Sequence, residues 1–348
     1  MIKKVQWGVL STANIGMEKV IPAMQRSLFA EVAAIASRSI DQAQSAAQKL
    51  GIVKAYGSYE ALIADPNIEA IYNPLPNDLH VPWTLAAARA GKHVLCEKPV
   101  ALTASEAARL REVADKVHIM EGFMVRFHPQ WLRARELVRS GALGDLRAIQ
   151  VFFSYFNRDA SNIRNRAECG GGALYDIGCY AVVAGRFFFE TEPTRAIALL
   201  DHDPDFKADR TSSALMDFGS GRRLDFTVST QSTPYQRLHL VGAQKRLEIM
   251  IPFNASQEEE TTILMDDGKT LGGEGEQEVL ARSDQYTLQC DAFSQVIRGH
   301  MALPYGVEDA ISNMHALDAL FASGQSGRWE SVDPAAPAAS LLNAQDLR

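Results

Sequence analysis

Short apolar segments alternate with longer amphipathic ones through the first third of this 348-residue chain. A short apolar run bounded by turn residues predicts a strand, and apolar positions at helical spacing predict a helix. Strands are predicted at Val5–Leu10, Val32–Ala36, Ala70–Tyr72, His93–Cys96 and His118–Met120, and helices at Gly16–Arg26, Asp41–Leu50, Val81–Ala90 and from Thr103 onward. Asp41 is expected to cap its helix, and Thr103 with Glu106 forms a capping box. The long crossovers indicate parallel strands with helices on both faces of the sheet, so residues 1–122 are expected to form a doubly wound α/β domain.

The pattern changes to a period of two after about Gly122. Strands are predicted at Leu146–Tyr155, Arg195–Leu200, Ser213–Phe218, Arg223–Ser229, Arg237–Val241 and Lys245–Met250, and helices at Pro129–Ser140, Ala173–Phe189, Tyr286–Arg298 and Val307–Ala322. Consecutive strands with short connections indicate a largely antiparallel sheet. We therefore expect a second, α+β domain at residues 123–330, followed by a loose tail at 331–348.

Composition and charge exclude several classes of protein. Hydrophobic residues make up 47% of the chain and charged residues 22%, which is typical of a globular protein with a sizeable core. The net charge of −7 argues against a nucleic-acid partner, since such proteins carry basic patches. No run of about 18 apolar residues is present, so no membrane span is expected. The four cysteines show no paired or zinc-like spacing, which predicts reduced thiols, a cytoplasmic protein and no metal site.

The loop after the first strand resembles a dinucleotide-binding fingerprint. On the pattern G-x-G-x-x-G, Ser11, Ala13 and Gly16 occupy the three glycine positions. Small residues at these positions allow a tight turn and a close approach of the backbone to a pyrophosphate at the helix N-terminus. The same stretch could also be a plain strand-to-helix turn, but the α/β pattern around it favours cofactor binding.

The end of the second strand bears on which dinucleotide is bound. Enzymes that use NAD commonly place an acid there, to bind the ribose 2′-hydroxyl. This strand ends Ala36-Ser37-Arg38-Ser39, without an acid. Arg38 could pair with a 2′-phosphate and Ser37 could hydrogen-bond it, although a solvated arginine is common at such a place. The sequence therefore favours NADP over NAD.

Polar residues also follow the later strands, at the edge where parallel sheets bind ligands. They are Glu97-Lys98-Pro99, the stretch Asn73–Asn77, and Arg126-Phe127-His128. Pro99 restricts its own backbone and that of Lys98, so the lysine is held more rigidly than an ordinary strand-end lysine. Lys98 could donate to an alcohol or carbonyl oxygen beside a nicotinamide. His128 could be a ligand neighbour or a structural residue beside Pro129.

A second polar pair lies in the other half of the chain. Asp176 and Tyr180 are four residues apart and would share one face of a helix. Such pairs are frequent by chance and often structural. The three glycines at 170–172 leave the start of this helix open to close approach, which favours a functional role.

These motifs together resemble the Gfo/Idh/MocA oxidoreductases. The small-residue loop, CEKP after a strand, GFMVRFHP and GGGALYDIGCY occur in the family's order, and the similarity covers roughly residues 3 to 330. The resemblance is to the NADP-dependent sugar and trans-dihydrodiol dehydrogenases, the group that includes glucose-fructose oxidoreductase. It implies a Rossmann domain followed by a domain with an open-faced sheet, through which a homodimer or homotetramer would form.

The resemblance also implies the residues of the site. The candidate catalytic residues are Lys98, Asp176 and Tyr180, and the candidate substrate-binding residues are these three with Tyr155, Asn162 and Arg164. The candidate cofactor-binding residues are Ser11, Thr12, Ala13, Asn14, Ile15, Ser37, Arg38, Asn73, Pro74, Leu75, Asn77, His80, Glu97, Lys98 and Arg126. Tyr155, Asn162 and Arg164 could each equally be ordinary strand or loop residues.

The implied reaction moves a hydride between nicotinamide C4 and a CH–OH or C=O carbon of a sugar or related cyclic polyol. Tyr180 would take or supply the hydroxyl proton. A phenol has an ordinary pKa of about 10, which a nearby cation such as Lys98 would lower. Asp176 would orient the substrate hydroxyl and the lysine, although its charge opposes that reduction.

Other classes of protein fit the sequence less well. A short-chain dehydrogenase needs Tyr-x-x-x-Lys, and no tyrosine here has a lysine four residues later. A metal-dependent alcohol dehydrogenase needs clustered His and Cys ligands, which the sequence lacks. The remaining alternative is a regulator that keeps the fold and binds NADP without turnover, because fold does not imply function. The joint presence of Lys98, Asp176 and Tyr180 favours the enzyme.

Overall fold

The computed structural model describes residues 3–270 and 275–332, which form two compact units. The first unit consists of residues 3–124 and 284–311, and the second of residues 125–283 and 312–332. Each unit has its own sheet and its own buried core.

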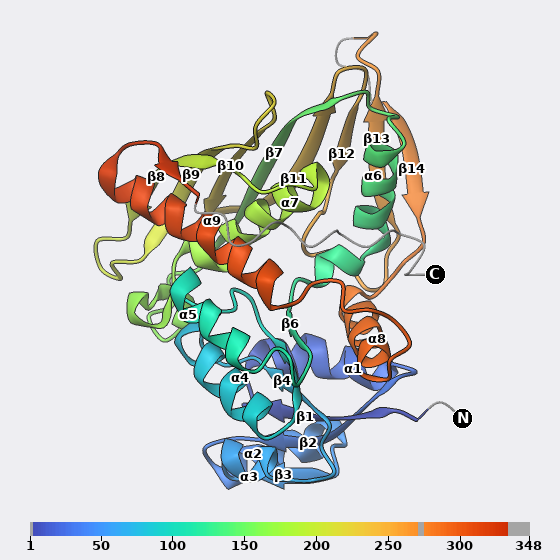
Figure 1. The fold of residues 1–348 in the computed structure, drawn as a ribbon, viewed down its shortest axis with the longest axis vertical. Helices are drawn as coiled ribbons and strands as arrows, with labels where there is room; N and C mark the ends of the chain where they lie inside the picture. Colours follow the sequence, from blue (N-terminus) through green and yellow to red (C-terminus); the bar gives the residue numbers. More distant parts are fainter. Residues whose placement is uncertain (1–2, 271–274, 333–348) are drawn as a thin grey trace. The chain divides into compact units, whose positions relative to one another are not determined.

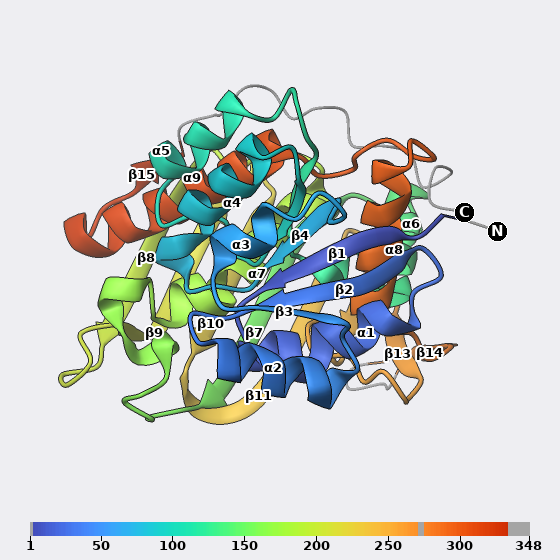
Figure 2. The same ribbon diagram turned by 90° about the horizontal axis from the view of Figure 1, so that it is seen from below.

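The first unit is built on a six-stranded parallel sheet in the order β3-β2-β1-β4-β5-β6. Its strands are β1 (Val5–Leu10), β2 (Ala30–Ala36), β3 (Lys54–Tyr56), β4 (Ala70–Asn73), β5 (His93–Cys96) and β6 (Ile119–Glu121). Its helices include the π-turn η1 (Gly16–Val20), α1 (Ile21–Arg26), α2 (Ile40–Leu50), α3 (Tyr59–Ile63), α4 (His80–Arg89), α5 (Ala104–Ala108) and α8 (Gln285–Ile297). In Figure 2, α1 and α2 lie on one face of this sheet and α3 and α4 on the other. The doubly wound Rossmann prediction is confirmed, and the strand order reverses between β1 and β4.

Hydroxyl side chains cap two helices of this unit, α2 and α5. The prediction that Asp41 caps α2 is wrong, because the Ser39 hydroxyl accepts a hydrogen bond from the amide of Gln42 at 3.4 Å. Asp41 lies in the first turn, where its charge suits the positive end of the helix dipole. At α5, the Thr103 hydroxyl accepts from the amide of Glu106 at 3.1 Å, as predicted.

Helix α8 returns from late in the sequence to the first unit. The indole of Trp7 on β1 donates to the hydroxyl of Ser294 at 3.3 Å. The guanidinium of Arg298 binds the carboxylate of Glu69 at 2.7 Å and the carbonyl oxygen of Lys4 at 2.8 Å. The predicted domains, 1–122 and 123–330, assign α8 to the second domain, whereas residues 284–311 belong to the first unit. Nearly all of the tail expected at 331–348 lies outside the described residues.

The second unit is built on a nine-stranded sheet in the order β14-β13-β12-β11-β7-β10-β9-β8-β15. Its strands are β7 (Leu146–Phe156), β8 (Arg195–His202), β9 (Asp209–Asp217), β10 (Arg223–Ser229), β11 (Gln231–Gly242), β12 (Arg246–Ile249), β13 (Thr261–Asp266), β14 (Glu276–Leu280) and β15 (Glu330–Ser331). Only the β7–β10 pair is parallel among the described strand pairs of this sheet, so the mostly antiparallel prediction is confirmed. The last three strands were not predicted.

The helices of the second unit cover one face of its sheet. They are α6 (Pro129–Arg139), the π-turn η7 (Leu174–Gly178) with α7 (Cys179–Phe189), and the part of α9 (Val307–Ser326) from residue 312 onward, and Figure 1 shows α6 and α7 over the strands. Trp131 of α6 packs against Phe187, Phe188 and Phe253 in the core beneath them. The opposite face exposes apolar side chains, including those of Phe152 and Leu199.

No helix among the described residues is long and apolar enough to cross a membrane. The four cysteines all lie in the described part of the chain, and no two of them form a disulfide. Within residues 3–270 and 275–332, no group of three or more His, Cys, Asp or Glu side chains is arranged to hold a metal ion.

Candidate active site

The turn Ser11–Ala13 follows β1, and Asn14 and Ile15 already belong to the helical segment after it. The strand order reverses at this point, which is where doubly wound sheets bind ligands. Ser11 has a backbone φ of +71°, the left-handed conformation that glycine adopts most easily. Its hydroxyl accepts a hydrogen bond from the amide of Ala13 at 3.3 Å. The chain thus keeps the tight turn of the fingerprint although serine replaces the first glycine. Thr12 lies on the same turn, and Asn14 is the first helical residue after it.

The end of β2 presents Arg38. Ser37 is buried, and its hydroxyl is bonded to the side chain of Gln42 at 3.1 Å, so it is already engaged within the unit. Arg38 is exposed and lies near the hydroxyl of Tyr59 on α3. Burial raises the pKa of Tyr59, and the charge of Arg38 opposes that rise. Arg38 therefore remains the candidate for a 2′-phosphate, and Tyr59 is a partner that the sequence analysis missed because α3 was not predicted.

Asn73 and His80 hold the loops after β4 and β5 rather than presenting polar atoms outward. The buried side-chain amide of Asn73 donates to the carbonyl oxygen of His80 at 3.1 Å and the hydroxyl of Thr84 at 3.2 Å. The ring nitrogens of His80 lie 2.7 Å from the carbonyl oxygens of Leu75 and of Pro99. Any contribution of these two side chains to a cofactor site is thus through the loops that they position. Pro74 and Asn77 belong to the first of those loops.

Burial and hydrogen bonding act on His80 in opposite directions. Burial lowers its pKa to about 4, while its two carbonyl partners raise it. Two acceptor oxygens favour the charged ring, which has two N–H donors. The complete burial of the ring decides the balance, so His80 is a neutral imidazole near neutral pH.

Lys98 is half-buried just after the end of β5. The hydroxyl of Tyr72 donates to Glu97 at 2.7 Å, and the amide of Val100 donates to Glu121 at 2.8 Å. The Lys98–Pro99 peptide bond is cis. The residues on both sides of Lys98 are therefore anchored to neighbouring strands, as the prediction of a rigidly held lysine required.

Arg126 and His128 stand at the start of the second unit. Arg126 is buried in a 3₁₀ turn at Met124–Phe127. The Nδ1 atom of His128 accepts a hydrogen bond from the amide of Gln130 at 3.2 Å and caps α6. This contact favours the structural alternative for His128.

Asp176 gathers two of the predicted substrate residues around its carboxylate. The Tyr155 hydroxyl on β7 donates to its Oδ2 atom at 2.5 Å, and Nε of Arg164 donates to the same atom at 3.1 Å. Burial and then the charge of Asp176 raise the pKa of Tyr155, so its phenol stays protonated. Asp176 likewise raises the pKa of Arg164. Asn162 caps the short turn before Arg164, accepting from its amide at 3.0 Å, which is a structural role.

Tyr180 lies on the helix that continues from Asp176. Its residue is only 6% exposed, and its ring packs against Phe253 at 5.5 Å and Phe153 at 6.2 Å between centroids. Tyr180 is also close enough to Arg164 to raise the pKa of that guanidinium. Asp176 and Tyr180 thus both raise the pKa of Arg164, which agrees with their lying on the same side of the helix.

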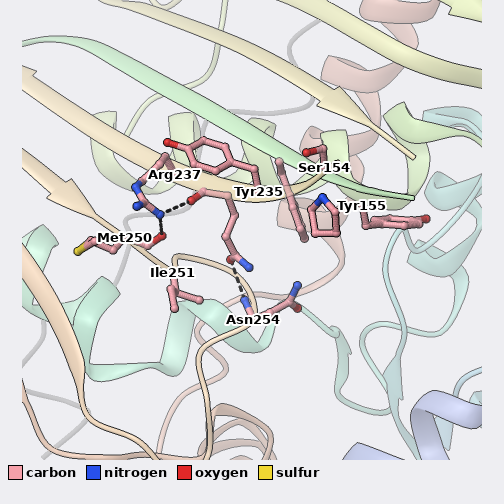
Figure 3. Close-up of a pocket in the computed structure, with 10 residues that line it drawn as sticks. Ser154, Tyr155, Tyr235, Arg237, Met250, Ile251 and Asn254 are labelled. Carbon is pink, nitrogen blue, oxygen red and sulfur yellow. Dashed lines mark hydrogen bonds between the residues drawn. The ribbon is translucent and has the colours of Figure 1, made fainter. Parts of the chain in front are cut away.

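A cavity of about 420 Å³ opens beside Tyr155 (Figure 3). Aromatic, amide and aliphatic side chains make up most of its wall, which consists of Phe153, Ser154, Tyr155, Pro234, Tyr235, Gln236, Arg237, Met250, Ile251 and Asn254. The pairing of β11 with β7 is interrupted between Gln231 and Tyr235. Arg237 donates to the carbonyl oxygen of Met250 at 2.6 Å. The sequence analysis missed this cavity because residues 250–254 form an irregular loop without a periodic pattern.

Two family models match the chain. "Oxidoreductase family, NAD-binding Rossmann fold" matches residues 5–126, and "GFO/IDH/MocA C-terminal domain" matches residues 131–248. These ranges correspond to the Rossmann sheet and to the strands around Asp176.

Several known proteins are similar over almost their whole length. The chain is 44% identical over 331 residues to an uncharacterized oxidoreductase, ORF334, of Rhizobium meliloti, covering 94% of this chain and 99% of that one. It is 37% identical over 335 residues to D-xylose 1-dehydrogenase (NADP(+)) 2 of Haloferax volcanii, covering 94% and 100%. Among solved structures, KijD10, a 3-ketoreductase from Actinomadura kijaniata in complex with NADP and TDP-benzene, matches with a TM-score of 0.86 at 29% identity, covering 92% of this chain and 98% of that one.

Proposed function

Because the chain belongs to the GFO/IDH/MocA family of oxidoreductases, we propose that it is an NADP-dependent dehydrogenase or reductase of sugars or related cyclic polyols. The observation that carries this proposal is the carboxylate of Asp176, held by Tyr155 and Arg164 on the helix that also carries Tyr180. A polyhydroxylated substrate needs several fixed donors and acceptors, and this cluster supplies both. The similarity to a D-xylose dehydrogenase and to a 3-ketoreductase supports the same substrate class.

The residues after β1 and β2 fit NADP. The left-handed Ser11 and the small Ala13 leave the backbone of the loop accessible to a pyrophosphate, and Arg38 provides an exposed guanidinium where many NAD enzymes have an acid. NADP supplies the hydride acceptor or donor at its nicotinamide. The similar D-xylose dehydrogenase and 3-ketoreductase carry NADP in their names or complexes, which supports this choice.

The proposed chemistry divides between three side chains. Lys98 donates a hydrogen bond to the reacting oxygen and stabilises its negative charge. Tyr180 takes the hydroxyl proton during oxidation and returns it during reduction. Asp176 accepts from a substrate hydroxyl and orients it, while Tyr155 and Arg164 hold the carboxylate in place. The cavity beside Tyr155 offers aromatic and amide groups to the rest of the substrate.

The test is a fluorescence titration with NADPH and NADH, followed by a screen of aldoses, keto-sugars and trans-dihydrodiols for turnover. Tight NADPH binding with turnover of at least one of these substrates is the expected result. Cofactor binding without turnover of any substrate would instead favour a regulator of the same fold.

Replacing Arg38 by Ala is expected to weaken NADPH binding about 10- to 100-fold, because a charge-assisted bond to the 2′-phosphate contributes about 1.5–3 kcal/mol. The dissociation constant for NADH should stay unchanged, since NADH has no phosphate at this position. Fluorescence titration measures both constants on one preparation. Arg38→Lys keeps the charge but not the two-pronged geometry, so its dissociation constant for NADPH should lie between those of the wild type and Arg38→Ala. An equal loss for NADPH and NADH would contradict the role of Arg38.

We also propose that copies of the chain associate through the uncovered face of the sheet in the second unit. Phe152 and Tyr235 pack edge to face at 5.6 Å between ring centroids, and both are exposed, as is Leu199 on β8. Apolar clusters of this kind mark protein interfaces. Sedimentation velocity is expected to show a dimer or tetramer, and Leu199→Asp should shift the protein towards a smaller species. A wild-type monomer at micromolar concentration would contradict the proposal.

A further inference from the structure

A buried carboxylate contacts the start of the helix that carries Asp176 and Tyr180. Asp209, the first residue of β9, is 3% exposed. Its Oδ2 atom accepts from the backbone amide of Leu174 at 2.7 Å and from the hydroxyl of Ser212 at 2.5 Å. Amides in the first turn of a helix have no partner within the helix. Asp209 therefore anchors this helix two residues before Asp176.

Gly172 shows how closely this carboxylate approaches the loop before the helix. A Cβ atom added to Gly172 would lie 2.0 Å from Oδ1 of Asp209, and the backbone φ of +116° also excludes other residues. The amide of Gly172 donates to the carbonyl oxygen of Arg164 at 2.9 Å, and its carbonyl accepts from the amide of Asp176 at 3.0 Å. Asp209 therefore contacts a residue, Gly172, whose backbone is hydrogen-bonded to the backbones of both Arg164 and Asp176.

A carboxylate is an unfavourable choice if the helix needs only a cap. Serine or asparagine would also accept from the Leu174 amide, without a buried charge. Burial raises the pKa of Asp209 to about 6, against the opposing effects of Ser212 and the Leu174 amide, so the group is ionised at neutral pH. Its folded pKa lies above the ordinary value of 3.8, so this group lowers the stability of the fold as the pH rises from about 4 to about 6, and the whole cost is present above about pH 6.

The charge of Asp209 reaches the site through Tyr155. It contributes to the raised pKa of that phenol, after burial, Asp176 and the opposing effect of Arg164. A protonated Tyr155 is the form that donates to Asp176. His202 on β8 is the other titratable side chain that acts on Asp209.

We propose that Asp209 is a positioning residue for the reaction: its carboxylate fixes the first turn of the helix that carries Asp176 and Tyr180, through the Leu174 amide. This role rests on the proposed function. It differs from a purely structural cap because loss of the Leu174 contact should lower kcat while the protein stays folded.

Asp209→Ala and Asp209→Leu remove the acceptor for the Leu174 amide. Both are expected to lower kcat on a sugar about 10- to 100-fold, because small displacements of positioning groups have effects of this size. The Kd for NADPH should not rise, because Asp209 lies outside the predicted cofactor-binding residues. The melting temperature at pH 8 should stay close to that of the wild type, because removal of a buried charge offsets loss of the helix cap. Ser212→Ala, which removes the other donor to the same oxygen but keeps the charge and the Leu174 contact, is the matched control and should keep kcat within about threefold.

The outcomes separate this role from the proposed function. Absence of turnover in the wild type defeats the proposed function itself. With wild-type turnover, a normal kcat in both Asp209 variants overturns the role of Asp209, as does a loss of kcat in step with loss of folded protein. If one variant fails to fold, the other decides by the same criteria. Failure of both to fold would overturn the proposal in favour of a structural cap.

Discussion

Replacing Lys98 by Met is expected to lower kcat about 100- to 10,000-fold, the range for loss of a group that manages a proton or a developing charge in the transition state. Methionine matches the length of the lysine stem but cannot donate to the reacting oxygen. NADPH binding should change by less than about threefold, because the interaction is made with the transition state rather than with the resting cofactor. Single-turnover and steady-state kinetics, with NADPH fluorescence titration on the same samples, measure both quantities.

The surroundings of Lys98 make this substitution a clean test. Glu97 is held by Tyr72, and Val100 is held by Glu121, and both contacts survive the change at residue 98. Lys116→Met, at an exposed lysine of the same unit, is the matched control and should leave kcat unaltered. A Lys98→Met protein with wild-type kcat, or one that loses NADPH binding as much as turnover, would show that Lys98 has no role in the chemical step.

Most strands of the first sheet, and the polar residues at their ends, could be predicted because their local pattern is clear, whereas β3 and β13 to β15 were not predicted. The run His93–Cys96 has the length and composition of a strand buried on both faces, and the acid and lysine that follow it were therefore assigned to the binding edge. The positive φ of Ser11 shows that the backbone keeps the fingerprint turn even where the side chain departs from glycine. Sequence periodicity and turn chemistry are sufficient for features of this kind.

Contacts between distant segments could not be predicted in the same way. Asp209 opens a strand far along the chain from Gly172, and nothing in either local pattern indicates that the carboxylate fills the space where a Cβ would lie. The return of α8 depends on Trp7 and Ser294, which are separated by 287 positions. A capping error arose at Asp41 because Ser39 and Asp41 are both good caps, and only the backbone geometry decides between them.

Replacing Tyr180 by Phe is expected to lower kcat about 100- to 10,000-fold while the fold is retained, because the change removes only the hydroxyl that is proposed to carry the proton. The ring keeps its packing against Phe153 and Phe253, so the melting temperature should stay close to that of the wild type. NADPH binding should also be preserved. The measurements are kcat with a sugar that the wild type turns over, thermal unfolding, and cofactor titration.

Tyr175→Phe is the matched control for this prediction. Tyr175 lies on the same helical segment, next to Asp176, but its ring packs against Phe321 at 4.5 Å between centroids. The two variants lose the same hydroxyl group from neighbouring turns, so a large loss of kcat in Tyr180→Phe alone assigns the proton to one phenol. Equal effects in both would mean that the helix is perturbed as a whole. A normal kcat in Tyr180→Phe would leave Lys98 as the only remaining candidate for the proton among the three proposed catalytic residues, since Asp176 is already engaged by Tyr155 and Arg164.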